Sequence, residues 1–196
     1  MGGRSGGGAS GGMGSGSRIG GLVRGDTETG YSAELSRSVL KAEGEIKDQK
    51  NETIVIFNDD GTVAFRKDGT RMGVTYDGRK GTDKVVTHNH PGPDAPFSSS
   101  DLRDAVKFNE KEIRAVSRNY TYSMKRPQGG WGSVKPDAVM RTYSTIKRQV
   151  AKEWDSRISS ASSGAGVRTE YFKSQIEVQR RIAKKYGWNF SYKKNK

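Results

Sequence analysis

Apolar residues between positions 32 and 46 recur at the spacing of a helix. Leu35, Val39 and Ile46 fall on one face of such a helix. Gly44, which has a low helix propensity, weakens the prediction near the end of the segment. The next segment, ETIVIFNDDGTVAFRKDG, places two β-branched and aromatic runs on either side of NDDG. A polar, glycine-containing tetrapeptide between two such runs is typical of a hairpin turn. The pattern therefore predicts a short helix followed by two antiparallel strands.

The pattern of apolar positions predicts further strands and a helix between residues 71 and 127. Residues 71–83 are polar and contain glycine, which predicts a loop with a short strand at 72–76, and residues 84–87 form a compact apolar strand. The segment SSSDLRDAVKF has apolar residues at helical spacing, and EIRAVSRN and YTYSMKRP have the composition of a second hairpin. This order of elements predicts an α/β fold in which helices pack on a mixed β-sheet.

A longer helical pattern begins at Pro136. Apolar and aromatic residues recur every three or four positions from Val139 to Ile158, and the proline falls in the first turn. The segment SSASSGAG interrupts this pattern, and the same spacing resumes between Phe172 and Tyr186 with many basic residues in the other positions. We therefore expect a basic, helical C-terminal extension over residues 131–196.

The first thirty residues are dominated by glycine and serine. Such a segment cannot bury enough apolar surface to offset the conformational entropy lost on ordering, which predicts a disordered tail over residues 1–30. The predicted organisation is thus a tail over 1–30, a domain over 31–130 and the helical extension over 131–196.

The chain is strongly basic. Its 196 residues include 35 lysines and arginines against 22 aspartates and glutamates, a net charge of +13, which favours contact with polyanions such as nucleic acid or with an acidic protein surface. The basic C-terminal segment also contains aromatic side chains that could stack on bases or pack on a partner, namely Tyr171, Phe172, Tyr186, Trp188, Phe190 and Tyr192. A nucleic acid or an acidic partner is therefore a candidate ligand of the C-terminal helices.

Two absences narrow the classes of function. No apolar run approaches the roughly 20 residues that span a bilayer, and the N-terminus lacks the apolar core of a secretory signal, so we expect no membrane partner and a cytoplasmic location. The chain has no cysteine, which excludes disulfides and thiolate metal ligands. Any bound metal must then be held by histidine, carboxylate or water.

The chain's only two histidines, His88 and His90, are separated by one residue at the end of a predicted strand. Side chains alternate along a strand, so both imidazoles point to the same side and can reach one ion. Asp101 follows at the start of the next predicted helix and offers a carboxylate. Three protein ligands with water in the fourth position are typical of a catalytic zinc site.

The segment Ser98-Ser99-Ser100-Asp101 also has a purely structural interpretation. A serine at the N-cap and an acidic residue three positions later form a capping box, which satisfies free N–H groups at the start of a helix. This interpretation does not explain the histidines at the end of the preceding strand, and one carboxylate can serve both roles. We therefore favour a metal site that coexists with the cap.

The motif H-x-H-P, followed by S-x-x-D with seven residues between His90 and Ser98, resembles the signature of the JAMM (JAB/MPN-type) zinc metalloproteases, H-x-H-x7-S-x2-D. The form His-Asn-His-Pro is most similar to the bacterial RadC-like branch and to related domains of phage head-morphogenesis proteins and prophage toxins. The resemblance covers roughly residues 32–127. It implies a JAB/MPN-like (cytidine-deaminase-like) mixed sheet with packed helices, and hydrolysis of a peptide or isopeptide bond.

The resemblance also implies a role for each residue of the motif. His88, His90 and Asp101 would hold Zn²⁺, and the Ser98 hydroxyl would hydrogen-bond the oxyanion that develops on the substrate. The family places its catalytic glutamate at the head of a core strand, a position that Glu52 matches best. The alternatives for this general base are Glu43 and Glu45, which fall near the end of the first predicted helix.

A second function remains open at this stage. The chain could be a phage structural or DNA-associated accessory protein, in a virion if it is phage-encoded, with a catalytically silent JAMM-like scaffold. In that case the basic C-terminal helices would bind its partner through the net positive charge.

Overall fold

A computed structural model describes residues 30–92 and 94–195 of the chain. The tail predicted over residues 1–30 lies, apart from its last residue, outside this range. The described elements are α2 (Ala33–Ile46), β1 (Thr53–Phe57), β2 (Val63–Asp68), the 3₁₀ helix η1 (Gly78–Gly81), β3 (Val85–Asn89), α3 (Ser99–Lys107), β4 (Glu112–Val116), β5 (Tyr120–Lys125), α4 (Pro136–Ser159), α5 (Gly164–Tyr186) and β6 (Asn189–Lys194).

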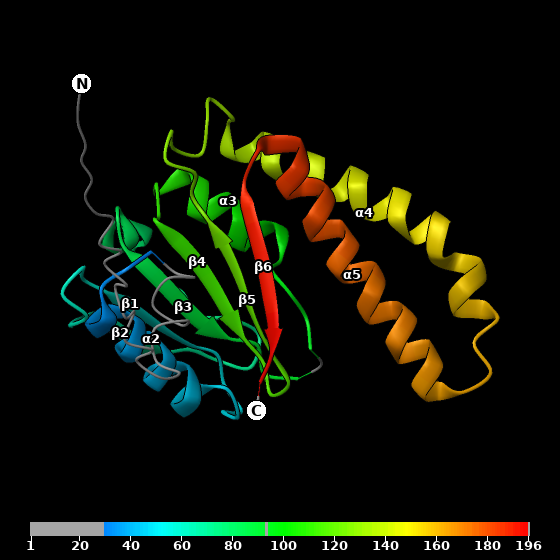
Figure 1. The fold of residues 1–196 in the computed structure, drawn as a ribbon, viewed down its shortest axis with the longest axis horizontal. Helices are drawn as coiled ribbons and strands as arrows, with labels where there is room; N and C mark the ends of the chain where they lie inside the picture. Colours follow the sequence, from blue (N-terminus) through cyan, green and yellow to red (C-terminus); the bar gives the residue numbers. More distant parts are fainter. Residues whose placement is uncertain (1–29, 93, 196) are drawn as a thin grey trace, which may run out of the picture.

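The six strands form one mixed sheet in the order β2-β1-β3-β4-β5-β6 (Figure 1). Strands β3 and β4 are parallel and are joined through α3, whereas every other pair of neighbours is antiparallel. Both hairpins expected from the sequence, β1-β2 and β4-β5, are present. The prediction of an α/β fold with a mixed sheet and packed helices is therefore confirmed.

Helices cover the two faces of the sheet unequally. Helix α2 packs its apolar side, centred on Leu35 and Val39, against Val55 of β1 and Val85 of β3. Helices α3, α4 and α5 lie on the other side of the sheet, where their apolar residues share a core with Tyr122 of β5 (Figure 1). Helices therefore cover one face of strands β4, β5 and β6. On the opposite face, α2 packs on β1 and β3 and leaves part of these three strands uncovered.

The end of the chain differs from the prediction of a purely helical extension. Helices α4 and α5 are present, but α5 ends at Gly187, whose φ of 70° is left-handed, and the next residues form β6. Strand β6 pairs with β5 over six residues, so the segment becomes the sixth strand of the sheet. Sequence analysis missed strand β6 because Lys193 and Lys194 gave the segment the composition of a polar tail.

Two tryptophans tie the extension to the rest of the fold. Trp131 and Trp188 are both about 95% buried and belong to the core cluster that includes Leu102 of α3 and Tyr122 of β5. The Trp131 indole N–H donates to the Glu110 carbonyl at 2.9 Å, and the Trp188 indole N–H donates to the Trp131 carbonyl at 3.1 Å. The segment after residue 130 therefore completes a shared core.

The short strand predicted at 72–76 is absent. The chain there forms a tight turn in which Thr70 N–H donates to the Gly73 carbonyl at 2.9 Å, and Gly73 has a φ of 147°. Thr70 and Gly73 form an isolated bridge there, without the consecutive pairs of a regular strand. Val74 and Tyr76 instead lay their side chains over Ile54 and Val86 on the face of the sheet opposite α2.

Candidate metal centre

Strand β3 presents both histidines. It runs through the middle of the sheet between β1 and β4, and all of its residues are buried. His88 belongs to the strand, and His90 follows it and extends the pairing, because its N–H donates to the Val116 carbonyl at 2.9 Å. The two Nε2 atoms consequently lie 2.9 Å apart. The sequence prediction that alternation brings the two imidazoles together is met in the structure.

Helix α3 brings Asp101 to the same point. Its Oδ2 atom lies 3.8 Å from His88 Nε2 and 3.7 Å from His90 Nε2. A zinc ion holds histidine nitrogens and carboxylate oxygens at about 2.0–2.2 Å, so two atoms bound to one ion can lie no more than about 4.4 Å apart. All three separations meet this limit, and these residues are a group that could hold a metal ion. The donor set of two imidazoles and one carboxylate suits zinc.

The capping box and the metal-ligand arrangement use the same carboxylate. Ser98 N–H donates to Asp101 Oδ2 at 2.6 Å, and Asp101 N–H donates to Ser98 Oγ at 3.2 Å. The capping box predicted from the sequence is therefore confirmed. Because the cap fixes the carboxylate that faces the histidines, the start of α3 also sets the position of the third candidate ligand.

Hydrogen bonding fixes the His90 ring. Its Nδ1 lies 2.8 Å from the Ala95 carbonyl. A carbonyl can only accept, so Nδ1 carries a proton, and in the neutral form of the ring Nε2 has its lone pair directed toward His88 and Asp101. Orientation of a ligand through its other ring nitrogen is a common feature of histidine metal sites.

The electrostatics of His88 and Asp101 suit a metal site. Burial lowers the pKa of His88 to about 4, against the opposing charge of Asp101, so its imidazole is neutral at pH 7 and can donate a lone pair. Burial also opposes ionisation of Asp101, but interactions with both histidines and the Ser98 N–H hold the pKa of that carboxyl well below its usual range. Burial disfavours the imidazolium form of His90, and Asp101 outweighs burial and raises its pKa. Zinc requires an anionic carboxylate and neutral imidazoles, so a bound ion would compete with the proton that Asp101 favours on His90.

Glu52 lies in the same cavity as the three candidate ligands. It immediately precedes β1, and its backbone is held by hydrogen bonds with Thr70 and Gly69 at 2.9 and 2.8 Å. The cavity has a volume of about 360 Å³. Burial raises the pKa of the Glu52 carboxyl, Asp101 raises it further, and His90 opposes the shift. A carboxyl with a raised pKa beside a metal site suits a general base that accepts a proton from water.

The two alternative glutamates lie elsewhere. Glu43 of α2 is buried on the other face of the sheet, where Arg114 donates to its two oxygens at 2.6 and 3.2 Å. Glu45 is exposed and pairs with Arg66 at 3.1 Å. Of the three glutamates considered from the sequence, Glu52 alone lines the cavity that contains His88.

Sequence analysis missed a buried acid behind this cavity. Glu110 is completely buried, and the hydroxyl of Tyr76, which lines the cavity, donates to its Oε1 at 3.3 Å. Burial raises the pKa of Glu110 well above its usual range, and its Oε2 has no hydrogen-bond partner among the described residues. No sequence signal pairs these residues, because Tyr76 lies in a loop 34 positions earlier.

The aromatic side chains of the C-terminal segment are mostly occupied. Trp188 is buried, the Tyr186 hydroxyl donates to Thr142 Oγ1 at 2.7 Å, and Phe172 stacks on Tyr120 with centroids 4.4 Å apart. Of the six aromatics singled out from the sequence, only Tyr171 and Tyr192 are more than a third exposed, at 55% and 39%. Most of this set therefore packs within the protein.

Comparison with known proteins identified no relative of this chain. No family model, curated protein or solved structure matches the chain. Within residues 30–92 and 94–195, no helix is both long and apolar enough to cross a bilayer. The JAMM resemblance therefore rests on the motif residues and on the geometry that they adopt here.

Proposed function

We propose that the protein is a zinc-dependent hydrolase of peptide or isopeptide bonds. The observation that carries the proposal is the convergence of His88, His90, Asp101 and Glu52 on one cavity, with the three ligand atoms within bonding reach of a single ion. Three protein ligands leave a fourth position for water or substrate, and a carboxyl that is not a ligand is available for proton transfer.

Each residue has a distinct role in this proposal. Bound zinc would supply a water with a pKa of about 7 and would polarise the scissile carbonyl. With the metal in place, Glu52 would accept a proton from water and deliver it to the departing nitrogen. Ser98 Oγ lies 2.8 Å from Ser100 Oγ, and when Ser100 is the donor of that bond the Ser98 hydroxyl proton is free to hydrogen-bond the developing oxyanion.

The class of bond comes from the JAMM resemblance. The order of a helix, a hairpin, the histidine-bearing strand, a capped helix and a second hairpin is consistent with a JAB/MPN-like domain of the RadC-like branch. We extend the proposal to a phage or prophage origin on the same resemblance.

The proposal predicts hydrolysis that depends on the metal. Zinc-loaded protein, screened on a panel of peptides and isopeptide-linked peptides by mass spectrometry, should cleave at least one substrate. A chelator should abolish this cleavage, and added Zn²⁺ should restore it, because the metal supplies the nucleophile. Cleavage that persists after complete metal removal would contradict the proposal.

A second candidate function rests on charge. Residues 136–196 contain fourteen of the chain's lysines and arginines but only five acidic residues. Many basic side chains of α4, α5 and β6 are exposed and have no ion pair among the described residues: Arg141, Lys147, Arg148, Lys152, Arg157, Arg168, Arg180, Lys184, Lys185, Lys193 and Lys194. This distribution favours binding of a polyanion such as DNA.

Binding to DNA should then be steeply dependent on salt. If about six phosphates are contacted, affinity for a duplex should fall on the order of 10³-fold between 50 and 200 mM salt, because condensed counterions are released. Replacing Lys147, Arg148 and Lys152 of α4 with alanine should weaken binding and lower the salt slope in a fluorescence-anisotropy titration. Substitution is preferable to truncation, because removing residues 136–196 would also remove β6 and part of the core.

A matched variant distinguishes a specific surface from total charge. Alanine at Lys41, Lys50 and Arg71, three exposed basic residues outside the C-terminal segment, removes the same charge. It should weaken binding much less than the α4 variant. Equal weakening by both variants, or binding that does not change with salt, would count against a polyanion surface on the C-terminal helices.

A further inference from the structure

The residue between the two histidines, Asn89, has a completely buried side chain. It is the last residue of β3 and is 0% exposed. Because side chains alternate along a strand, Asn89 points away from the candidate metal centre, toward the face of the sheet on which α2 packs. A buried amide is costly unless both its oxygen and its nitrogen have hydrogen-bond partners. The partners of Asn89 therefore show what this position connects.

The Asn89 amide joins β3 to the segment that carries Glu52. Its Oδ1 accepts a hydrogen bond from the Thr53 N–H at 2.6 Å, and its Nδ2 donates to the Asn51 carbonyl at 3.0 Å. Asn51 and Thr53 are the residues on either side of Glu52. One side chain therefore holds the backbone both before and after the proposed general base.

This contact lies where the backbone pairing of β1 with β3 ends. The last pair of residues joins Ile54 to His88. One residue further along β3, the side chain of Asn89 supplies the acceptor for the Thr53 N–H. The amide thus continues the connection between the two strands beyond their last backbone pair.

A second set of hydrogen bonds holds Glu52 from the opposite direction. Its N–H donates to the Thr70 carbonyl at 2.9 Å, and its carbonyl accepts from the Gly69 N–H at 2.8 Å. These bonds attach Glu52 to the turn that follows the edge strand β2, whereas the bonds of Asn89 attach the same segment to the strand that bears His88. The Asn89 contacts therefore link the base to the candidate ligands.

An amide suits this position better than other side chains of its size. The Thr53 N–H needs an acceptor and the Asn51 carbonyl needs a donor, and an amide carries both groups on one carbon. An ionised aspartate has no donor, and a leucine has neither group. The orientation of the Asn89 amide follows from the same two partners, because the opposite orientation would place donor against donor.

We propose that Asn89 is a positioning residue that fixes the Glu52 carboxylate with respect to the metal centre. This inference rests on the proposed hydrolase, in which Glu52 is the general base. Alternation along the chain places Glu52 on the same side as Ile54, and both line the metal cavity. A shift of the backbone on either side of Glu52 therefore moves its carboxylate within that cavity. A misplacement of about 1 Å can cost roughly 10²-fold in rate.

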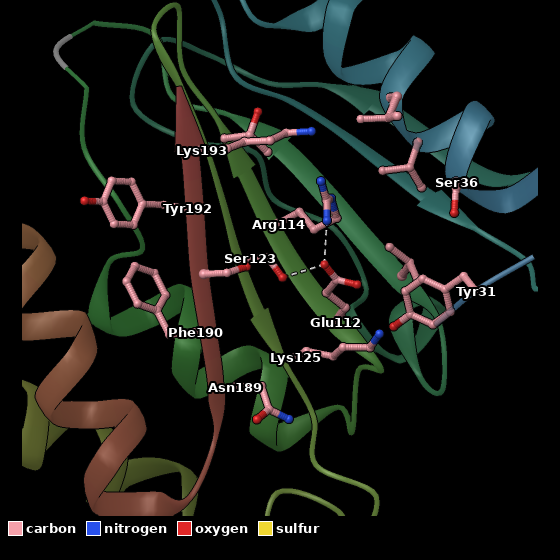
Figure 2. Close-up of a pocket in the computed structure, with 15 residues that line it drawn as sticks. Tyr31, Ser36, Glu112, Arg114, Ser123, Lys125, Asn189, Phe190, Tyr192 and Lys193 are labelled. Carbon is pink, nitrogen blue, oxygen red and sulfur yellow. Dashed lines mark hydrogen bonds and ion pairs between the residues drawn. The ribbon is translucent and has the colours of Figure 1, made fainter. Parts of the chain in front are cut away.

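Thr87 provides a matched control. It lies two residues before Asn89 on the same strand and the same face, is 0% exposed, and donates from Oγ1 to Glu43 at 3.2 Å. Glu43 pairs with Arg114, which lines a cavity of about 570 Å³ between α2 and strands β4, β5 and β6 (Figure 2). Thr87→Val therefore removes a buried hydrogen bond on this face and leaves those around Glu52 in place.

The test compares the wild type, Asn89→Leu and Thr87→Val as full chains. Each is loaded with Co²⁺, a divalent ion of the same series as Zn²⁺, whose unpaired electrons shift the NMR signals of nearby nuclei. The signal of the Glu52 carboxyl carbon, identified by its absence from Glu52→Gln, should show a large Co²⁺-induced shift in the wild type and in Thr87→Val. Asn89→Leu should lose most of this shift, because the carboxylate is no longer held beside the ion.

Three further measurements separate positioning from a general loss of structure. Asn89→Leu should bind Zn²⁺ within about tenfold of the wild type, because Asn89 bonds to neither histidine, whereas loss of a group bonded to a ligand costs about 10–100-fold. Its kcat should fall by about 10²-fold while KM stays unchanged. In metal-free protein the Thr53 amide should exchange with solvent faster than in the wild type, because its acceptor is lost.

If Asn89→Leu does not fold, Asn89→Asp takes its place, since it keeps the acceptor and loses only the donor. The inference is overturned if the variant keeps the Glu52 shift of the wild type, if Thr87→Val reduces that shift equally, or if the variant loses zinc as His88→Ala does. Failure of the wild type to bind either metal would overturn the proposed hydrolase and this inference with it. An unchanged Glu52 shift in a metal-loaded variant would overturn the role of Asn89 alone.

Discussion

Replacing Glu52 with glutamine should leave zinc bound and reduce hydrolysis by about 10²–10⁴-fold. Glutamine keeps the shape of the side chain and removes its basicity, so the water at the metal loses its proton acceptor while the ligands His88, His90 and Asp101 remain in place. The measurement is kcat/KM on the substrate found by the metal-dependent screen, with zinc content determined on the same sample. The loss should appear in kcat, because proton transfer occurs on the way to the transition state.

The two other glutamates provide the controls. Glu45→Gln changes an exposed residue that pairs with Arg66, and it should retain wild-type rates. Glu43→Gln weakens a buried pair with Arg114, so it should lower the free energy of unfolding while the folded, zinc-loaded fraction keeps its activity. Wild-type turnover in Glu52→Gln, with loss of turnover in Glu43→Gln at unchanged stability, would place the base on α2.

Purified protein, freed of any histidine tag, should bind close to one zinc per chain, and His88→Ala or His90→Ala should abolish this stoichiometric binding. Loss of a group that only orients a ligand typically weakens metal affinity by about 10–100-fold, and loss of a ligand should cost more. Free zinc at 100 times Kd should stabilise the wild type by about 2.7 kcal/mol, which raises Tm by about 5–10 °C. Both effects are measurable by metal analysis and thermal unfolding.

Asp104 offers a matched control for the carboxylate ligand. It lines the same cavity one turn further along α3, but its partner is Arg103. Asp104→Asn should therefore retain zinc, whereas Asp101→Asn, in which an amide oxygen can still accept the Ser98 N–H, should bind zinc much more weakly. Equal zinc affinity in Asp101→Asn and the wild type would remove Asp101 from the ligand set.

The candidate metal centre could be predicted because its geometry is local. A two-residue spacing on a strand determines that His88 and His90 share a side, and the N-cap position determines where Asp101 lies in α3. The distance between strand and helix did not follow from the sequence, yet the connection from His90 to Ser98 is short enough to hold them together. The choice of Glu52 over Glu43 depends on tertiary structure, because only the packing of α2 on the sheet shows that Glu43 faces Arg114.

The parts of the fold that sequence analysis missed depend on long-range pairing. The segment NFSYKK has alternating apolar and polar residues, but β6 forms only because β5, more than sixty positions earlier, offers an edge. The burial of Trp131 and Trp188 likewise depends on helices that meet across the core. The pairing of Tyr76 with Glu110 joins a loop to a buried position before β4, and no local pattern indicates such a contact.

The most direct test of the metal centre is an anomalous difference map at the zinc absorption edge from crystals of the zinc-loaded protein. The account predicts one strong peak on the face of the sheet opposite α2, about 2.0–2.2 Å from His88 Nε2, His90 Nε2 and an Asp101 carboxylate oxygen, with Glu52 near the ion but not bound to it. A well-ordered map with no peak at these three residues, or with the only zinc bound elsewhere, would contradict it.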